Sequence, residues 1–245
     1  MIDVLFRSGM TVELDRWLGD DALIATSARV VRPTGHRQDT EVREAGLSAS
    51  AQSRDHRLMT MLMRDRHGTP WEAVVLRFYV EAPLFVATQF NRHRIASVSA
   101  ASGRYREQQP VFYLPAPDRP LVQTGRPGDY TYQQGTPEQH ATATRVLEHQ
   151  AREAYAAYME LLAAGVAREI ARTVLPTSLY TAWYLTINLR SLFNLLSLRN
   201  ATGSTTVPTH PQREAQMVAE LMERHARGVV PFAMSLFDTY GRTAP

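Results

Sequence analysis

The most apolar segment of the sequence runs from residue 180 to residue 199, and its spacing predicts a single buried helix. Leucines recur along one face, at Leu185, Leu189, Leu192 and Leu196. Polar side chains interrupt the helix. Asn188 and Arg199, three turns apart, would share a face, and Arg190 and Asn194 would form an i, i+4 pair beside it. An unpaired buried polar group costs roughly 1–3 kcal/mol. Two interpretations stay open: these residues pair across a subunit interface, or they line a ligand cavity.

The remaining patterns predict a mixed fold. Alternating or β-rich runs predict strands over residues 2–6, 74–80 and 111–114. Apolar spacing, caps and breakers predict helices over residues 20–31, 55–66, 84–91, 136–164, 167–175 and 211–227, with a short helix after them. Residues 33–53, 115–135 and 201–209 are predicted loops, and the second, rich in proline and glycine, is a candidate lid. We therefore expect an α+β fold, a small antiparallel sheet flanked by long helices, in one domain spanning residues 1–245.

Composition excludes several kinds of chemistry. The chain has no cysteine, which rules out disulfides, zinc–thiolate sites and a thiol nucleophile. We expect no metal site. No run approaches the about 20 apolar residues of a membrane span, and the first residues do not resemble a signal peptide, so we expect a cytoplasmic protein. All 27 basic residues are arginines. Either phosphate binding or the codon bias of a GC-rich genome accounts for that.

Residues 92–105 combine arginines, a histidine, serines and a glycine in a mixture that no core or helix face requires. Arg92, Arg94 and Arg104 offer planar forks that match phosphate oxygens. Gly103 allows a ligand to approach the backbone closely. The segment predicts an anion-binding loop, with a solvated basic turn as the alternative.

The spacing Arg92-His93-Arg94, seven residues, then Ser102 resembles the signature of flavin-dependent thymidylate synthases. The similarity runs from about His56 to Arg199. It implies the thymidylate synthase-complementing-protein fold and a homotetramer whose active sites are shared between subunits. The implied reaction is the reductive C5-methylation of a uridylate. Methylenetetrahydrofolate would supply the carbon, FAD would mediate the transfer, and NADPH would reduce the flavin.

The resemblance also assigns roles to individual residues. The implied flavin contacts are Thr69 from a neighbouring subunit, Arg92, His93, Arg94, Asn188, Arg190, Asn194 and His210. The implied nucleotide contacts are Gln89, Arg92, Ser102, Gly103, Arg104, Arg172 and Arg199. Arg199 would be catalytic, favouring ionisation at N3 of the pyrimidine and stabilising the negative charge that develops at C5.

The chain departs from the family pattern at two positions, with Ala73 in place of a histidine and Ala100 in place of a glutamate. The loop at 201–209 is also longer than usual. One consequence is a catalytically inactive member that still binds nucleotide and flavin. Another is room for a ribose 2′-hydroxyl, so that UMP is accepted as well as dUMP. A branch of the family in antibiotic biosynthesis of the polyoxin type does this.

A rival from another class is an arginine-rich nucleic-acid-binding protein. It would be colourless, and its binding would depend strongly on salt concentration. The sequence offers neither a basic helix nor an aromatic platform for that role, so we expect no nucleic-acid partner and no membrane partner.

Overall fold

The structure is a computed structural model that describes residues 3–30, 49–202 and 205–245. It divides into two compact units. The first unit comprises Met1–Thr11, Glu81–Arg92 and Ser99–Trp183. The second comprises Val12–Val80, His93–Val98 and Tyr184–Pro245. The expectation of one domain over residues 1–245 stays a prediction. Residues 33–48 of the predicted loop 33–53 lie outside the described residues. Residues 49–53 are helical, so the prediction of a loop is wrong there.

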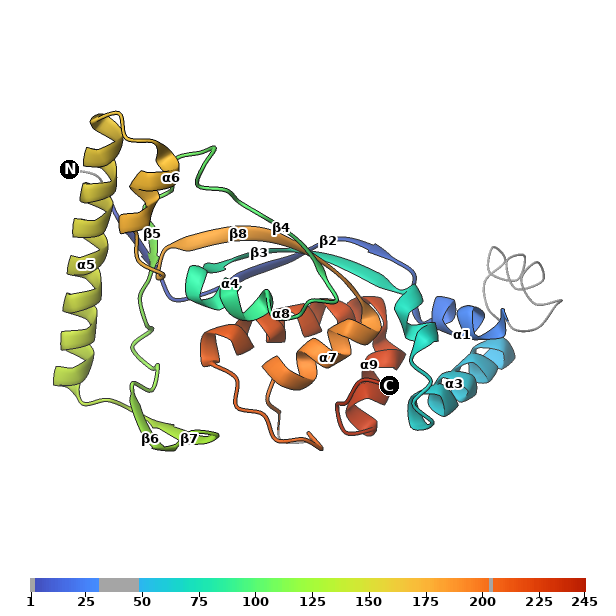
Figure 1. Cartoon of the computed structure of the whole chain (residues 1–245). Coiled ribbons are helices and arrows are strands. Elements are labelled where there is room, and N and C mark those ends of the chain that lie inside the picture. The colour runs from blue at the N-terminus through green and yellow to red at the C-terminus, as the bar shows by residue number, and fades with distance from the viewer. Residues whose placement is uncertain (1–2, 31–48, 203–204) are drawn as a thin grey trace. The chain divides into compact units, whose positions relative to one another are not determined.

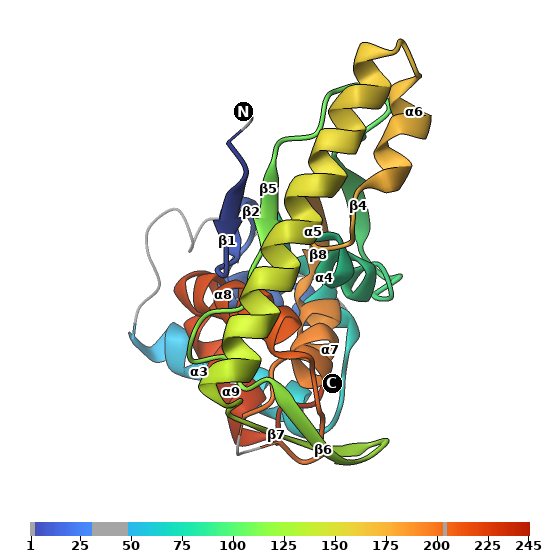
Figure 2. The same ribbon diagram turned by 90° about the vertical axis from the view of Figure 1, so that its left-hand side faces the viewer.

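Figures 1 and 2 show the order of helices and strands along the chain. The first unit contains β1 (Leu5–Arg7), α4 (Leu84–Phe90), β5 (Val111–Tyr113), β6 (Val122–Arg126), β7 (Asp129–Gln133), α5 (Pro137–Ala163), α6 (Arg168–Ala171) and the 3-10 helix η2 (Arg172–Val174). The second contains α1 (Asp21–Arg29), α3 (Ala49–Arg64), the 3-10 helix η1 (Thr69–Ala73), α7 (Leu189–Arg199), α8 (Arg213–Val229) and α9 (Pro231–Thr239). Four strands have residues in both units: β2 (Thr11–Leu18), β3 (Val75–Pro83), β4 (Ser97–Ala100) and β8 (Tyr180–Asn188).

These four strands form the main sheet, in the order β2-β3-β8-β4. Strand β3 confirms the predicted strand 74–80 because Leu76, Phe78 and Val80 alternate with more exposed residues and are fully buried. The predicted α+β class, with a small antiparallel sheet and flanking helices, is confirmed. Strands β2 and β4 were not predicted. No helix in the described ranges is both long enough and apolar enough to cross a membrane.

The first unit is organised around helix α5, whose start the sequence predicts correctly. Thr136 accepts from the backbone N–H of Gln139, and the Gln139 side chain accepts from the backbone N–H of Thr136, which completes a capping box. Tyr155 and Tyr158 on this helix pack with Phe112 of β5 in the unit's core. Helix α6 lies beside α5 (Figure 2).

The predicted lid at 115–135 contains a β-hairpin instead of a structureless loop. Strands β6 and β7 pair antiparallel from Val122↔Gln133 to Arg126↔Asp129. The turn between them uses Gly128 with a φ of 87°, a conformation that glycine adopts without strain. Thr124 and Thr131 also share a cross-strand hydrogen bond of 2.7 Å. The high proline and glycine content concealed two short alternating runs.

The prediction of one helix over 180–199 is wrong. Residues Tyr180–Asn188 form strand β8, in which Trp183, Leu185 and Ile187 are buried in alternation, and α7 begins only at Leu189. Apolar residues at every second position also fit a helical stripe at some positions, which explains the error. Asn188 is the N-cap of α7, with φ −77° and ψ 160°. It therefore does not share a helical face with Arg199.

Helix α7 is fixed in the core of the second unit through Phe193. This side chain is fully buried and stacks on Phe237 of α9, with ring centroids 4.6 Å apart. It also meets the edge of Trp71 in η1, with centroids 5.8 Å apart. Helix α8 lies beside α7 and α9 (Figure 1). The packing of Phe193 thus joins three elements of this unit.

We expect Phe193→Ala to lower the free energy of unfolding by about 3–5 kcal/mol, because it leaves a cavity between two aromatic rings. Leu198→Ala is the matched control on the same helix, since Leu198 is 45% exposed, and it should change stability by no more than about 0.5 kcal/mol. Urea denaturation of both variants measures the difference. Equal stabilities would contradict this account of the core.

Candidate functional site

In the first unit, Gly103 and Arg172 lie against each other. Gly103 is buried, and a Cβ at this position would lie 2.7 Å from Gln108 Nε2 and 3.1 Å from Arg172 Cδ. Only glycine therefore leaves both side chains where they are. Two of the predicted nucleotide contacts, far apart in the sequence, are brought together here.

Gln108, which the sequence did not single out, anchors this loop to helix α5. Its backbone N–H donates to the Tyr158 hydroxyl at 3.1 Å, and its carbonyl accepts from the Tyr155 hydroxyl at 3.0 Å. Burial raises the pKa of Tyr155, helped by the charge of Glu107, so this hydroxyl remains a donor. The two tyrosines thus fix the backbone five residues after Gly103.

Arg104 is held more loosely than its neighbours. Its Nε donates to Glu169 Oε2 at 2.9 Å, and about half of each side chain is exposed to solvent. Exposed ion pairs contribute little, at most about 1 kcal/mol. A phosphate group can therefore compete with Glu169 for this guanidinium. The Ser102 hydroxyl accepts from the Arg104 backbone N–H at 3.3 Å, while Gln89 and Arg92 lie on and just after helix α4.

In the second unit, His93 and Arg199 are in contact. Arg199 Nε donates to His93 Nε2 at 3.2 Å. The pKa of His93 is lowered to about 4, chiefly because burial disfavours the imidazolium and also because the Arg199 guanidinium is close. The imidazole is neutral at pH 7, and its proton is assigned to Nδ1 because Nε2 accepts. The pair therefore carries one positive charge, on Arg199.

A second contact in this unit surrounds Arg190. Its Nη1 forms an ion pair with Glu72 Oε1 at 2.8 Å, and its Nε donates to the Pro245 carbonyl oxygen at 2.8 Å. A Cβ at Gly68 would lie 2.4 Å from the guanidinium carbon. The guanidinium thus packs on the glycine that precedes Thr69, the first residue of η1. Glu72 and Gly68 were not predicted, although Gly68 directly precedes Thr69 and Glu72 lies three residues after it.

The other predicted flavin contacts have fewer links to the predicted site residues described above. Asn188 Oδ1 accepts from the Ser191 backbone N–H at 2.8 Å, so this side chain caps α7. Arg94, Asn194 and His210 are exposed. Within the part of the chain that the structure describes, no hydrogen bond or ion pair joins these three to another predicted site residue.

The sequence matches one protein family over most of its length. Residues 14–232 match the family described as thymidylate synthase complementing protein. A flavin-dependent thymidylate synthase from Streptomyces avermitilis is 44% identical over 241 residues, which cover 98% of this chain and 95% of the relative. A flavin-dependent thymidylate synthase from Tropheryma whipplei is 40% identical over 245 residues, which cover 100% of this chain and 99% of the relative.

The fold is similar to that of the UMP/dUMP methylase PolB from Streptomyces cacaoi. The crystal structure bound with 5-Br UMP has a TM-score of 0.89 at 37% identity, covering 99% of each chain. The structure bound with 5-Br dUMP has a TM-score of 0.88 at 38% identity, covering 99% of this chain and 100% of that one. The likeness extends well beyond residues 92–105.

The neutral state of His93 predicts that stability falls in acid. Its pKa drops from 6.5 in the unfolded chain to about 4 in the folded one. Between pH 6.5 and about pH 4, the unfolded chain binds a proton at His93 that the folded chain does not bind, so acid favours unfolding. The contribution of His93 is complete above about pH 6.5 and lost progressively towards pH 4. We expect a loss of roughly 2 kcal/mol, allowing for solvent screening, in urea denaturation across this range.

Two glutamine variants assign this effect to its residue. His93→Gln should remove this part of the pH dependence, whereas His210→Gln, at an exposed position, should retain it. Parallel curves for His93→Gln and the unsubstituted protein would show that His93 is not the group held neutral.

Proposed function

The chain belongs to the family of flavin-dependent thymidylate synthases, and we propose that it catalyses the FAD-dependent reductive C5-methylation of a uridylate. Methylenetetrahydrofolate would be the carbon donor and NADPH the reductant. The contact between Arg199 and His93 is the observation that carries the proposal. It presents a cation, held by a neutral imidazole, in the sequence context where the family places its pyrimidine-activating arginine.

Arg199 would act by stabilising negative charge on the pyrimidine. A guanidinium beside the imide favours loss of the N3 proton and the enolate-like charge that develops as C5 becomes nucleophilic. His93 accepts from Arg199 Nε and so orients the guanidinium. Because the imidazole is neutral, it does not repel the guanidinium or add a second charge.

The donors in the second unit fit a flavin dinucleotide. Arg190 rests on Gly68 and is ion-paired with Glu72, in a pair whose side chains are 45% and 43% exposed. A diphosphate can compete for such a guanidinium, because a partly exposed pair is weak and a phosphate matches the guanidinium fork. Asn194, Arg94 and Thr69 add exposed polar groups. FAD, when bound, would supply the redox chemistry that no side chain of this chain provides.

Gly103, Arg104 and Arg172 would hold the nucleotide. The buried Gly103 lets Arg172 approach the loop, and Arg104 can exchange Glu169 for a phosphate. We further propose that the enzyme is a homotetramer in which Thr69 reaches flavin in a neighbouring subunit. This assembly rests on the family resemblance.

The absorption spectrum and a turnover assay together test the proposal. Purified protein should absorb near about 450 nm, as oxidised flavin does, and should methylate a uridylate when methylenetetrahydrofolate and NADPH are supplied. A flavin-bearing protein without turnover would indicate an inactive family member. A colourless protein that binds nucleic acid with strong salt dependence would support the rival function.

We expect both UMP and dUMP to be substrates, because the family's glutamate is replaced by Ala100 at the end of β4. The similarity to PolB, named a UMP/dUMP methylase, supports this. The ratio of kcat/KM for dUMP to that for UMP should lie within about tenfold, since a missing side chain leaves room without penalising either sugar. Ala100→Glu should raise that ratio by about tenfold or more. Complete rejection of UMP by the unsubstituted enzyme would refute this proposal.

Gly68→Ala tests the proposed flavin role of Arg190. Gly68 has φ −77° and ψ −36°, which alanine adopts readily, so the fold should be retained. The new Cβ would displace the Arg190 guanidinium, and FAD affinity should fall about tenfold, or about 1.4 kcal/mol. Fluorescence titration with FAD measures this.

Gly228→Ala is the matched control for that titration, because a Cβ at Gly228 meets nothing within 4 Å. It should leave FAD affinity unchanged. Equal affinities for the two alanine variants would mean that Arg190 does not contact flavin.

A further inference from the structure

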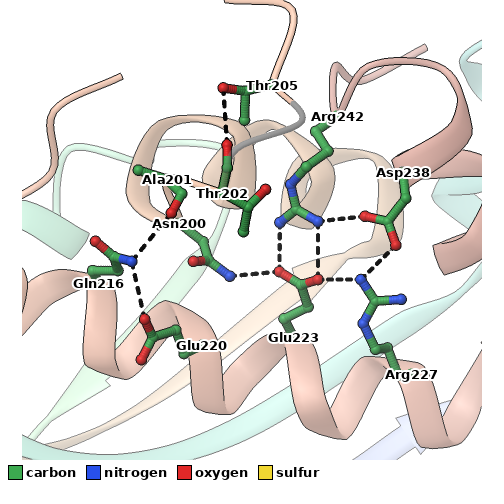
Figure 3. Close-up of polar contacts among 10 residues, drawn as sticks. All are labelled: Asn200, Ala201, Thr202, Thr205, Gln216, Glu220, Glu223, Arg227, Asp238 and Arg242. Carbon is green, nitrogen blue, oxygen red and sulfur yellow. Dashed lines mark hydrogen bonds and ion pairs between the residues drawn. The ribbon is translucent and has the colours of Figure 1, made fainter. Parts of the chain in front are cut away.

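Glu223 on helix α8 is the centre of a buried polar cluster that no sequence pattern indicated (Figure 3). Its Oε2 accepts from Asn200 Nδ2 and from Arg242 Nη2, each at 2.6 Å. Its Oε1 accepts from Arg242 Nη1 at 3.0 Å and also from Arg227 Nη2. Both oxygens of one carboxylate therefore receive two donors each. We name Asn200, Glu223, Arg227, Asp238 and Arg242 the Glu223 cluster.

The Glu223 cluster balances its charges internally. The side chains of Glu223 and Arg242 are 8% and 2% exposed. Burial acts to raise the pKa of Glu223, but hydrogen bonds from Arg242 and Arg227 and their charges outweigh it, so that pKa is lowered. Asp238 also accepts from Arg227 Nη2 at 2.7 Å and from Arg242 Nη1 at 2.5 Å. Two carboxylates thus face two guanidiniums, and the cluster has no net charge.

Asn200 is the member of this cluster that touches the proposed catalytic machinery. It directly follows Arg199, the last residue of α7, and its backbone leaves the helix with φ −125° and ψ 88°. Its backbone N–H donates to the Leu196 carbonyl at 2.9 Å, while its buried side chain donates to Glu223. The first bond closes the final turn of α7, and the second joins that turn to helix α8.

We propose that Asn200, held by Glu223 and Arg242, is the positioning residue for Arg199. The inference rests on the function proposed above for Arg199. Arg199 must direct one face of its guanidinium at a ligand while its Nε donates to His93 Nε2 at 3.2 Å. A displacement of about 1 Å can cost about 100-fold in rate, so the direction in which the helix ends has a catalytic effect. Asn200 sets that direction through a carboxylate that is itself immobilised.

Asn200→Ala tests the inference with little disturbance to the cluster. Glu223 keeps its three guanidinium bonds in this variant, so the charge balance survives. We expect kcat per bound flavin to fall about 10- to 100-fold, with flavin content and KM for the uridylate within about threefold of the unsubstituted enzyme. A loss of folded protein with unchanged kcat per bound flavin would mean that Asn200 has only a structural role.

A double-mutant cycle shows whether Asn200 acts through Arg199. If it does, Arg199→Ala combined with Asn200→Ala should have the same kcat as Arg199→Ala alone. Losses that multiply would overturn the inference. Full activity of Arg199→Ala would instead refute the proposed role of Arg199 itself, and the two failures are thereby distinguished.

Glu220→Gln is the matched control on helix α8. Glu220 accepts from Arg213 Nη1 at 2.6 Å, and its side chain is 36% exposed. It also accepts from Gln216 Nε2 at 3.0 Å (Figure 3). This variant should keep kcat per bound flavin within about twofold of the unsubstituted enzyme. If Asn200→Ala accumulates poorly, Asn200→Ser, which retains a small polar side chain, takes its place. Its kcat per bound flavin is then compared with that of Glu220→Gln. Equal kcat for Asn200→Ser and Glu220→Gln would also overturn the inference.

Discussion

The arginines of this protein differ chiefly in how deeply their partners are buried, and the proposed chemistry depends on that difference. Arg242 faces a carboxylate that is 8% exposed, so neither water nor a ligand replaces it easily. Arg104 and Arg190 face half-exposed carboxylates, which bind them weakly. Arg199 instead meets an imidazole that is neutral at pH 7. The same guanidinium group therefore serves as a structural tie, as an exchangeable anion contact or as a cation held by a neutral imidazole.

In the second unit, helix α7 connects arginines of these three kinds. Its N-terminal end carries Arg190, and its C-terminal end carries Arg199. The Glu223 cluster reaches the C-terminal end through Asn200. Arg242 also begins the segment whose Pro245 carbonyl accepts from Arg190 Nε. One buried ion pair is therefore connected to both ends of the helix, by a hydrogen bond at one end and by a short stretch of backbone at the other.

The backbone of that segment needs strong local support. Arg242 has a φ of 54°, a left-handed conformation that costs a residue with a side chain roughly 1–2 kcal/mol. It follows Gly241, whose φ is 80°, at the C-terminus of α9. The N–H groups of Gly241 and Arg242 donate to the carbonyls of Asp238 and Phe237, which is a Schellman motif. These bonds and the ion pairs of the Glu223 cluster offset the cost of the conformation.

Local sequence patterns predicted the features that depend on residues close together in the sequence. They failed for contacts between residues that are far apart in the sequence. Capping predicted the start of α5, and the motif at 92–105 pointed to the family, because both depend on residues close in sequence. The contact between His93 and Arg199 joins residues 106 positions apart, and no local spacing indicates it. The Glu223 cluster was missed for the same reason, since Asn200, Glu223 and Arg242 resemble ordinary surface residues when taken singly.

The wrong prediction over residues 180–199 shows that an apolar run does not by itself distinguish a strand from a helix. Its first half alternates and its second half follows a helical stripe, but the leucines alone fit a helix throughout. The boundary lies at Asn188, whose extended backbone ends the strand and whose side chain caps the helix. An asparagine in a predicted helix interior competes for backbone hydrogen bonds and disfavours the helix, so it was the available signal. The cap also fixes where α7 begins, at Leu189, one residue before Arg190. The residue that divides strand from helix thereby determines how Arg190 is presented to Glu72 and Gly68.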